Sequence, residues 1–402
     1  MLLAQIGSIV GYATYPSALE NIKAEWLLSN FQSGLIASAF FFGYISIVPL
    51  ATTLTDRMDA RRVYMLGAMT STIGLLGVGL WATGFYSAIA CLILVGAGVS
   101  ATYMPGLKIL SDRVKQGELT RHISFYTAFF GVGTALSYLS SGLVIQFYGW
   151  RSAFLLMSGG PLISFLIVYF ALDALPGEKG WRQLKFSLAD IFPVARWKQV
   201  MKSDNALSYM LGYAAHSLEL FATRSWMVSY LVFCSTISGE ANFLPIAAPI
   251  LVALINLAGV PASILGNEMA LKLGRRRWVV MVMLGSALCG LMVGVAPGWH
   301  WIPVILLTLL HSLFIMADSA TLTAGLVVSV PQEMKGVALG LHSLLGFGGG
   351  LLGPALFGAA LDFSASFNQH QPSWLLAYAT IVSFSVIFVI TKPFKGNQHG
   401  NL

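Results

Sequence analysis

Charged residues are scarce in this chain of 402 residues: Asp, Glu, Lys and Arg make up 10% of it, whereas 56% of the residues are hydrophobic. An average soluble domain carries about 25% charged residues, so the composition excludes a water-soluble globule. It also excludes a disordered chain, which needs low hydrophobicity. The formal net charge of +7 does not indicate a nucleic-acid binder, because the basic residues lie in short interruptions between apolar runs rather than on one face of a soluble fold.

Cysteine is equally rare, with only Cys91, Cys234 and Cys289. An odd number at this low density excludes a disulfide scaffold. The chain has no G-x-x-x-x-G-K-[ST] motif, so ATP-driven transport is not expected. Two G-x-G-x-x-A matches, at residues 77–82 and 96–101, lie inside uncharged runs and predict close helix packing instead of a nucleotide site. We expect no cofactor and no metal.

Long runs without a charged residue cover most of the chain, and about 20 apolar residues suffice for one transmembrane helix. Seven runs have room for one span each. The runs 63–107 and 278–317 each contain a turn signal and have room for two, and residues 205–233 form one more span. The sequence therefore predicts an all-α membrane protein with twelve transmembrane helices.

The basic residues predict how these helices are oriented. If the N-terminus is cytoplasmic, all but three of the 23 Lys and Arg residues fall on the cytoplasmic side, the exceptions being Lys23, Arg151 and Arg224. This bias follows the positive-inside rule. We therefore expect both termini in the cytoplasm of a bacterial inner (plasma) membrane. A signal peptide is not expected, because no charged segment precedes the first run.

The chain also repeats itself. An offset of about 215 residues places residues 56–62 on 271–277, and an offset of 216 places the glycine-rich residues 129–133 on 345–349. Both halves thus carry a basic loop after their second helix and a glycine-rich fifth helix, as in transporters built from two parallel six-helix repeats. We expect an N-terminal six-helix bundle at 1–172, a cytoplasmic central loop at 173–204, a C-terminal six-helix bundle at 205–391 and a cytoplasmic tail at 392–402.

The segment Leu54-Thr55-Asp56-Arg57-Met58-Asp59-Ala60-Arg61-Arg62 resembles the loop signature of the major facilitator superfamily, and the resemblance in topology covers the whole chain. It departs from that signature at Thr52 and Asp59, where the superfamily usually has glycine, although Gly274 restores the central glycine in the second copy. The residues Trp26-Leu27-Leu28-Ser29, Met104-Pro105-Gly106 and Gly149-Trp150-Arg151 are similar to those of bacterial anion and cyanate-like porters. The resemblance implies that loop residues lock and release one end of the bundle during alternating access, namely Asp56, Arg57, Arg61, Arg62, Arg275 and Arg276.

The span at 205–233 is unusual because it carries charged residues near its middle. At 100° per residue, one polar stripe contains Tyr209, Gly212, His216, Glu219, Thr223, Met227 and Tyr230, and Arg224 lies at its edge. Such a stripe predicts a surface that faces the pore. Ionisable groups inside a span usually serve a pathway or a partner, so we expect Glu219 to accept a proton, His216 to relay it and Arg224 to bind an anion.

A second titratable pair, His311 and Asp318, lies on one face of the tenth span. The resemblance implies that spans 1, 4, 7 and 10 surround a central cavity, so the two clusters are expected to face each other across it. Gln5 and Tyr12 on the first span and Tyr103 on the fourth are candidates for the remaining cavity wall. Tyrosines near membrane ends are, however, often interfacial anchors.

Structural alternatives stay open for each of these residues. The charged groups can neutralise one another and hold the seventh span in the bundle, His311 and Asp318 can form a structural hydrogen-bonded pair, and Arg224 can extend to the outer interface. His216 and Glu219 have the spacing of metal ligands, but a metal-binding bundle needs further carboxylates on facing helices, and few exist here.

The sequence thus predicts a monomeric secondary active transporter, neither an enzyme nor a partner of nucleic acid, that moves a small polar or anionic solute in symport with protons. Within transport, the competing interpretation is a proton-driven efflux pump for amphiphilic drugs. A non-transporting membrane sensor or a membrane-embedded enzyme is the alternative from another class. It lacks a soluble output domain and any recognisable nucleophile and base.

Overall fold

The computed structural model describes residues 1–55, 57–114, 116–174, 187, 191–239, 244, 246–367 and 372–391, and within them it contains helices and no strand. The expected tail at 392–402, Asp56 and much of the expected central loop lie outside the described residues. The helices are α1 (Leu2–Ile9), α2 (Thr14–Trp26), α3 (Asn30–Thr55), α4 (Ala60–Leu80), α5 (Phe85–Arg113), α6 (Gln116–Ala171), α8 (Val194–Met201), α9 (Asp204–Ser238), α10 (Ala248–Leu273), α11 (Arg275–Val295), α12 (Trp301–Ala317), α13 (Ser319–Val328), the 3₁₀ helix η2 (Gln332–Met334), α14 (Lys335–Phe367) and α15 (Trp374–Thr391).

These helices make twelve membrane crossings, as predicted. Ten described segments are each long and apolar enough to cross a membrane. One of them, in α6, makes two crossings, because Gly149 adopts a φ of 81° and reverses the chain there. This left-handed conformation favours glycine, which has no Cβ. The shorter helices α1 and α2 together form the first crossing, and α12 and α13 form the tenth around a break at Asp318.

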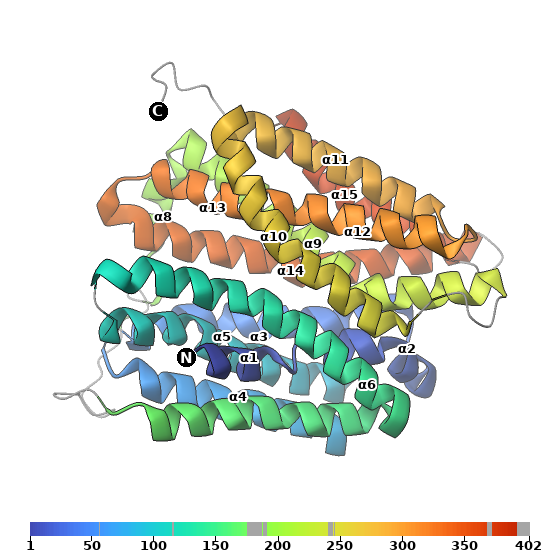
Figure 1. Ribbon diagram of the computed structural model, residues 1–402, viewed down its shortest axis with the longest axis horizontal. Coiled ribbons are helices and arrows are strands. Elements are labelled where there is room, and N and C mark those ends of the chain that lie inside the picture. The colour runs from blue at the N-terminus through green and yellow to red at the C-terminus, as the bar shows by residue number, and fades with distance from the viewer. Residues whose placement is uncertain are drawn as a thin grey trace.

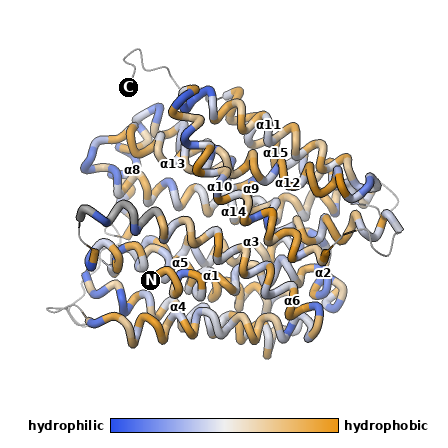
Figure 2. Tube along the Cα trace, viewed as in Figure 1, coloured by the Kyte–Doolittle hydropathy of each residue, from blue (hydrophilic) through white to orange (hydrophobic). Residues whose placement is uncertain are grey.

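The crossings form two layers that lie side by side along the long axis of the molecule (Figure 1). Helices α1–α6 make up one layer and α9–α15 the other. Hydrophobic residues dominate the length of the helices, and hydrophilic residues gather at both ends (Figure 2). We call the end that carries α8 and the loops before α4 and α11 the basic end, at the left of both figures. The other is the opposite end.

The two layers are joined tightly at the opposite end. The carboxylate of Asp362 on α14 accepts hydrogen bonds from the backbone N–H groups of Asn30 and Phe31, at 3.0 and 2.8 Å, and from the Asn30 side chain at 2.8 Å. These donors form the N-terminus of α3, so a residue of one layer caps a helix of the other. At the basic end, by contrast, a Cβ added to Gly336 or Gly340 of α14 would meet no described atom within 4 Å.

Glycines allow α3 and α5 to cross with their backbones in contact. A Cβ added at Gly96 would lie 1.8 Å from the carbonyl oxygen of Phe40, and one at Gly43 would lie 2.0 Å from that of Ile93. Small residues serve this purpose in membrane helices generally, because dispersion contacts drive their association. The interpretation of residues 96–101 as a packing segment is therefore confirmed.

We expect Gly96→Ala to lower the free energy of unfolding by about 3 kcal/mol or more, because α3 and α5 must separate to admit the methyl group. Gly159→Ala is the matched control, since a Cβ there meets nothing within 4 Å. Thermal unfolding of the detergent-purified variants measures the difference. Equal midpoints for Gly96→Ala and the wild type would contradict the packing described here.

Candidate functional site

Glu219 of α9 lies at the centre of a buried hydrogen-bond network. Its Oε1 accepts a hydrogen bond from Ser286 of α11 at 2.5 Å and lies 3.0 Å from Nε2 of His311 on α12, while its Oε2 accepts one from Ser385 of α15 at 2.7 Å. The Glu219 residue is 2% exposed and His311 is fully buried. A carboxylate can be held away from water in this way only where its oxygens are satisfied.

A second carboxylate–histidine pair lies next to the first. Nδ1 of His216 on α9 is 2.7 Å from Oδ1 of Asp318, and the two residues are 3% and 2% exposed. Asp318 sits where α12 ends and α13 begins. Helices α9 and α12 run antiparallel (Figure 1), so the earlier residue on α9, His216, pairs with the later one at the end of α12, Asp318, and Glu219 pairs with His311. Their side chains make two neighbouring bridges between the seventh and tenth crossings.

This arrangement differs from three of our expectations. The two titratable clusters do not face each other across a cavity but contact each other directly, and Glu219 pairs with His311 rather than with His216. The polar stripe also faces helices of its own layer: Glu219 contacts α11, α12 and α15, and Tyr230 donates a hydrogen bond to the carbonyl of Val293 on α11. Periodicity shows which residues share a face, but not which neighbouring helix covers it. Thr223 on the same stripe is 2% exposed, and its hydroxyl has no partner among the described residues.

Arg224 occupies a different face of α9, the one turned toward the other layer. Tyr138 of α6 donates a hydrogen bond to its backbone carbonyl at 2.6 Å. Its guanidinium interacts electrostatically with the phenol groups of Tyr12, Tyr138 and Tyr213 and lies 3.8 Å from Sδ of Met316. The residue is 7% exposed, so its charge does not extend to the outer interface. Among the described residues, its Nε has no hydrogen-bond partner, and no carboxylate forms an ion pair with its guanidinium.

An aromatic pocket adjoins this arginine. Its wall includes Tyr12, Phe40 and Phe41 from the N-terminal layer and Ser225 from α9. The Tyr12 ring packs edge-on against Phe40, with centroids 5.1 Å apart. Ligand pockets commonly combine apolar walls of this kind with a few polar groups. Sequence reasoning identified Tyr12 but missed both phenylalanines, whose signal is lost among the 25 Phe residues of the chain.

The other two predicted wall residues lie elsewhere in the N-terminal layer. The Tyr103 ring packs against Phe130, with centroids 5.5 Å apart, and Phe130 in turn lies 6.5 Å from Tyr12. Gln5 is fully buried, and neither its amide nitrogen nor its amide oxygen has a partner among the described residues.

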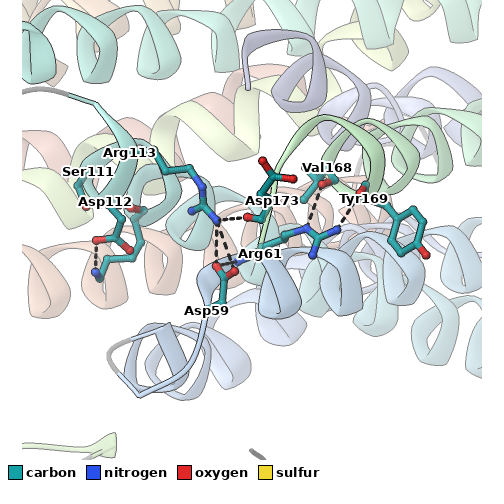
Figure 3. Close-up of polar contacts among 9 residues, drawn as sticks. Asp59, Arg61, Ser111, Asp112, Arg113, Val168, Tyr169 and Asp173 are labelled. Atoms are coloured by element: carbon teal, nitrogen blue, oxygen red, sulfur yellow. Dashed lines mark hydrogen bonds and ion pairs between the residues drawn. The ribbon is translucent and has the colours of Figure 1, made fainter. Parts of the chain in front are cut away.

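The loop at the basic end of the N-terminal layer forms a set of clamps (Figure 3). Asp59 caps α4 by accepting the backbone N–H of Arg61 at 2.9 Å, and it pairs with Arg113 of α5 at 3.4 Å. The Arg61 side chain donates to the carbonyls of Val168 and Tyr169, near the end of α6. These contacts tie together α4, α5 and α6, all within one layer.

The remaining residues of the predicted switch loops differ in what the structure describes of them. Asp56 lies outside the described residues. Arg57 and Arg62 are described, and each of them has an interaction partner. Nε of Arg275 is buried without a described hydrogen-bond partner, whereas Arg276 is exposed. The ion pair between Asp59 and Arg113 lies beside these loop residues, and the role expected for Asp56 and the loop arginines stays a prediction. The superfamily's usual glycine at position 59 gave no reason to expect this ion pair.

A family model described as "Major Facilitator Superfamily" matches residues 1–354. The chain belongs to this superfamily. A relative from Bacillus subtilis (strain 168), NiaP, which is named for niacin and nicotinamide transport, is 24% identical over 366 residues, or 90% of this chain and 86% of that protein. The chain is thus a multi-pass integral membrane protein and a secondary active transporter of a small solute, as the sequence predicted.

Solved structures of other superfamily members share this fold. A bacterial homolog of the human lysosomal transporter Spinster, in an inward-facing and unoccupied conformation, matches with a TM-score of 0.76 and 16% identity, covering 98% of this chain and 94% of that one. A D-xylose-proton symporter matches with a TM-score of 0.74 and 16% identity, covering 96% of each chain. At this identity the likeness extends to the fold alone.

Proposed function

We propose that this superfamily member carries a small organic anion across the bacterial inner membrane in symport with protons, acting as a monomer with both termini in the cytoplasm. In this proposal the six-helix bundles at 1–172 and 205–391 rock about the solute, and the basic end is the cytoplasmic one. The asymmetric distribution of Lys and Arg supports that orientation.

The observation that carries the proposal is the unpaired guanidinium of Arg224. An arginine inside a span costs at least about 2.5 kcal/mol on insertion scales, and a buried charge is normally paired. Here the described residues offer it phenol groups and a thioether, but no carboxylate. A planar fork of N–H donors fits a carboxylate with two parallel hydrogen bonds. An anionic solute therefore supplies the partner that the protein lacks.

The walls of the adjoining pocket narrow the class of solute. Tyr12, Phe40 and Phe41 line it, and aromatic rings pack favourably against one another. We therefore propose a monocarboxylate attached to a planar ring. Niacin, the pyridine carboxylate for which the Bacillus subtilis relative is named, belongs to this class. We use its anion, nicotinate, as the probe.

The carboxylate–histidine pairs supply the proposed coupling. Glu219 and Asp318 lie on helices that also border the anion site, because α9 carries Glu219 and Arg224, and α12 carries Met316 next to the Asp318 break. Proton uptake by a carboxylate weakens its ion pair with histidine and changes how α9 and α12 are held together. A proton and an anion bound to the same pair of helices can thus bias the same conformational change.

The test compares nicotinate with nicotinamide, which has the same ring and an uncharged amide. We expect nicotinate at 100 times its dissociation constant to add about 2.7 kcal/mol to the stability of the purified protein, and nicotinamide at the same concentration to add far less. Arg224→Gln should remove the effect of nicotinate, whereas Arg276→Gln, at an exposed arginine, should keep it. Thermal unfolding with each ligand measures this. Equal stabilisation of the Arg224→Gln variant would overturn the proposal.

A further inference from the structure

His342 of α14 is a buried histidine to which the proposed coupling gives no role. The residue is 3% exposed, and its Nδ1 has no hydrogen-bond partner among the described residues. Its Nε2 lies 3.1 Å from the hydroxyl of Thr323 on α13, which also contacts the carbonyl of Ser319 at 3.2 Å. A hydroxyl has one proton to donate, so it can either accept from His342 or donate to it. The site therefore accommodates more than one protonation state of this ring.

The rings of His342 and His216 both stack on that of Tyr213, and we call these three residues the His–Tyr–His sandwich. The ring of Tyr213 on α9 lies 3.8 Å from that of His342, at an interplanar angle of 17°. Tyr213 also stacks on His216, with centroids 5.5 Å apart at 16°. His216 in turn contacts Asp318. The sandwich thus leads directly to the carboxylate–histidine pairs.

These groups are ordered by depth from the basic end. His342 is seven residues from the start of α14, about 10 Å along the axis at 1.5 Å per residue, whereas His216 is twelve residues into α9, about 18 Å. Glu219 lies one further turn inward. On the basic side of His342, Gly336 and Gly340 are exposed, and a Cβ on either would meet no described atom. His342 is therefore the member of this series nearest to the basic end.

We propose that His342 is the group through which the His216–Asp318 pair exchanges its proton with the solvent at the basic end. An imidazolium at either histidine is stabilised by its stacking on the phenol ring of Tyr213, while two imidazolium ions at once repel each other. The sandwich consequently holds one proton. His342 takes it up at a ring nitrogen as His216 releases one, with water carrying the proton past Tyr213, and the reverse exchange returns it. Four further titratable or charged groups interact with the sandwich: Asp318 beside α13 contacts His216, and Arg224 on α9, Tyr103 on α5 and Tyr44 on α3 interact electrostatically with Tyr213.

The first experiment needs no transported solute. After a rapid pH jump, infrared spectroscopy of the purified protein follows protonation of the Asp318 carboxyl group, assigned by its loss in Asp318→Asn. We expect His342→Gln, which can still bond Thr323 but cannot take a charge, to slow this protonation at least tenfold without changing its end point, because positioned acid–base groups accelerate proton transfer by about 10²–10⁴-fold. His122→Gln is the matched control, at an exposed histidine of the same end. An unchanged rate in His342→Gln would overturn the proposal.

A second readout rests on the proposed anion transport. In proteoliposomes, His342→Gln should lose most of the nicotinate accumulation driven by a pH gradient, while exchange of external for preloaded nicotinate stays within about twofold of wild type, since exchange needs no net proton turnover. If wild type fails to move nicotinate, the proposed substrate class fails, and the infrared rates still decide the role of His342. Equal accumulation in His342→Gln and wild type would count against the relay.

Discussion

Replacing Glu219 by glutamine is expected to abolish the accumulation of nicotinate driven by a pH gradient, with a loss of at least about 100-fold. Glutamine has nearly the same shape and can still hydrogen-bond to Ser286, Ser385 and His311, the three partners of the native carboxylate. It cannot take up or release a proton. The variant should therefore fold and bind solute but lose the link between solute movement and the proton gradient.

Proteoliposomes measure this loss by comparing accumulation with exchange of preloaded nicotinate. We expect Glu219→Gln to retain exchange, which separates lost coupling from lost folding, because a misfolded protein would lose both. Glu268→Gln is the matched control, since Glu268 is an exposed carboxylate on α10. Full accumulation by Glu219→Gln would eliminate the proposed proton role of this residue.

The second large effect is expected at the opposite end, for Asp362→Ala. The Asp362 carboxylate of one layer accepts three hydrogen bonds from the N-terminus of α3 in the other. A hydrogen bond to a charged group contributes about 1.5–3 kcal/mol, and the helix dipole adds to it. Alternating access requires these bonds to break. Even a net loss of about 3 kcal/mol, the lower value for two such bonds, should shift the equilibrium toward a form open at this end by at least about 100-fold, because 1.4 kcal/mol corresponds to a factor of ten.

Double electron–electron resonance can measure this opening as a distance between two spin labels. The native residues Cys91, Cys234 and Cys289 are first replaced by serine, and spin labels are then attached to cysteines introduced at Tyr86 and Phe367. These two positions are 84% and 77% exposed and lie in different layers near the opposite end. The distance between the labels reports how far the layers are separated there. We expect a longer distance in Asp362→Ala, and an intermediate population in Asp362→Asn, which keeps an acceptor oxygen but no charge. If the distance distribution of Asp362→Ala matches that of wild type, the contact is not the latch between the layers.

The crossings could be predicted from the sequence because each depends on local composition. A run of about 20 apolar residues must cross as a helix wherever its neighbours lie, and the Lys and Arg positions separate the two ends. Arg224 and Glu219 could also be singled out, since a charge inside a span is costly whatever surrounds it. These features needed no knowledge of which helices touch.

The partners of the site residues could not be predicted, because they depend on how helices distant in sequence are rotated against each other. Glu219 and His311 are 92 residues apart, and Asp362 and Asn30 are 332 apart. His342 gave no signal at all, as a single histidine in a glycine-rich run. A search for buried histidines on every span, rather than on the two spans that also carry acidic groups, would have found it.

Helix α3 carries two glycines that have different neighbours. Gly43 rests on α5 of its own layer, whereas a Cβ at Gly34 would lie 2.3 Å from the carbonyl oxygen of Pro354 on α14 in the other layer. The first contact must persist through the whole transport cycle, and the second exists only while the opposite end is closed. Inherited changes at these two positions would consequently produce different phenotypes: cells with a bulkier residue at 43 would lack the protein, whereas cells with one at 34 would contain it in normal amounts but trapped in one half of its cycle.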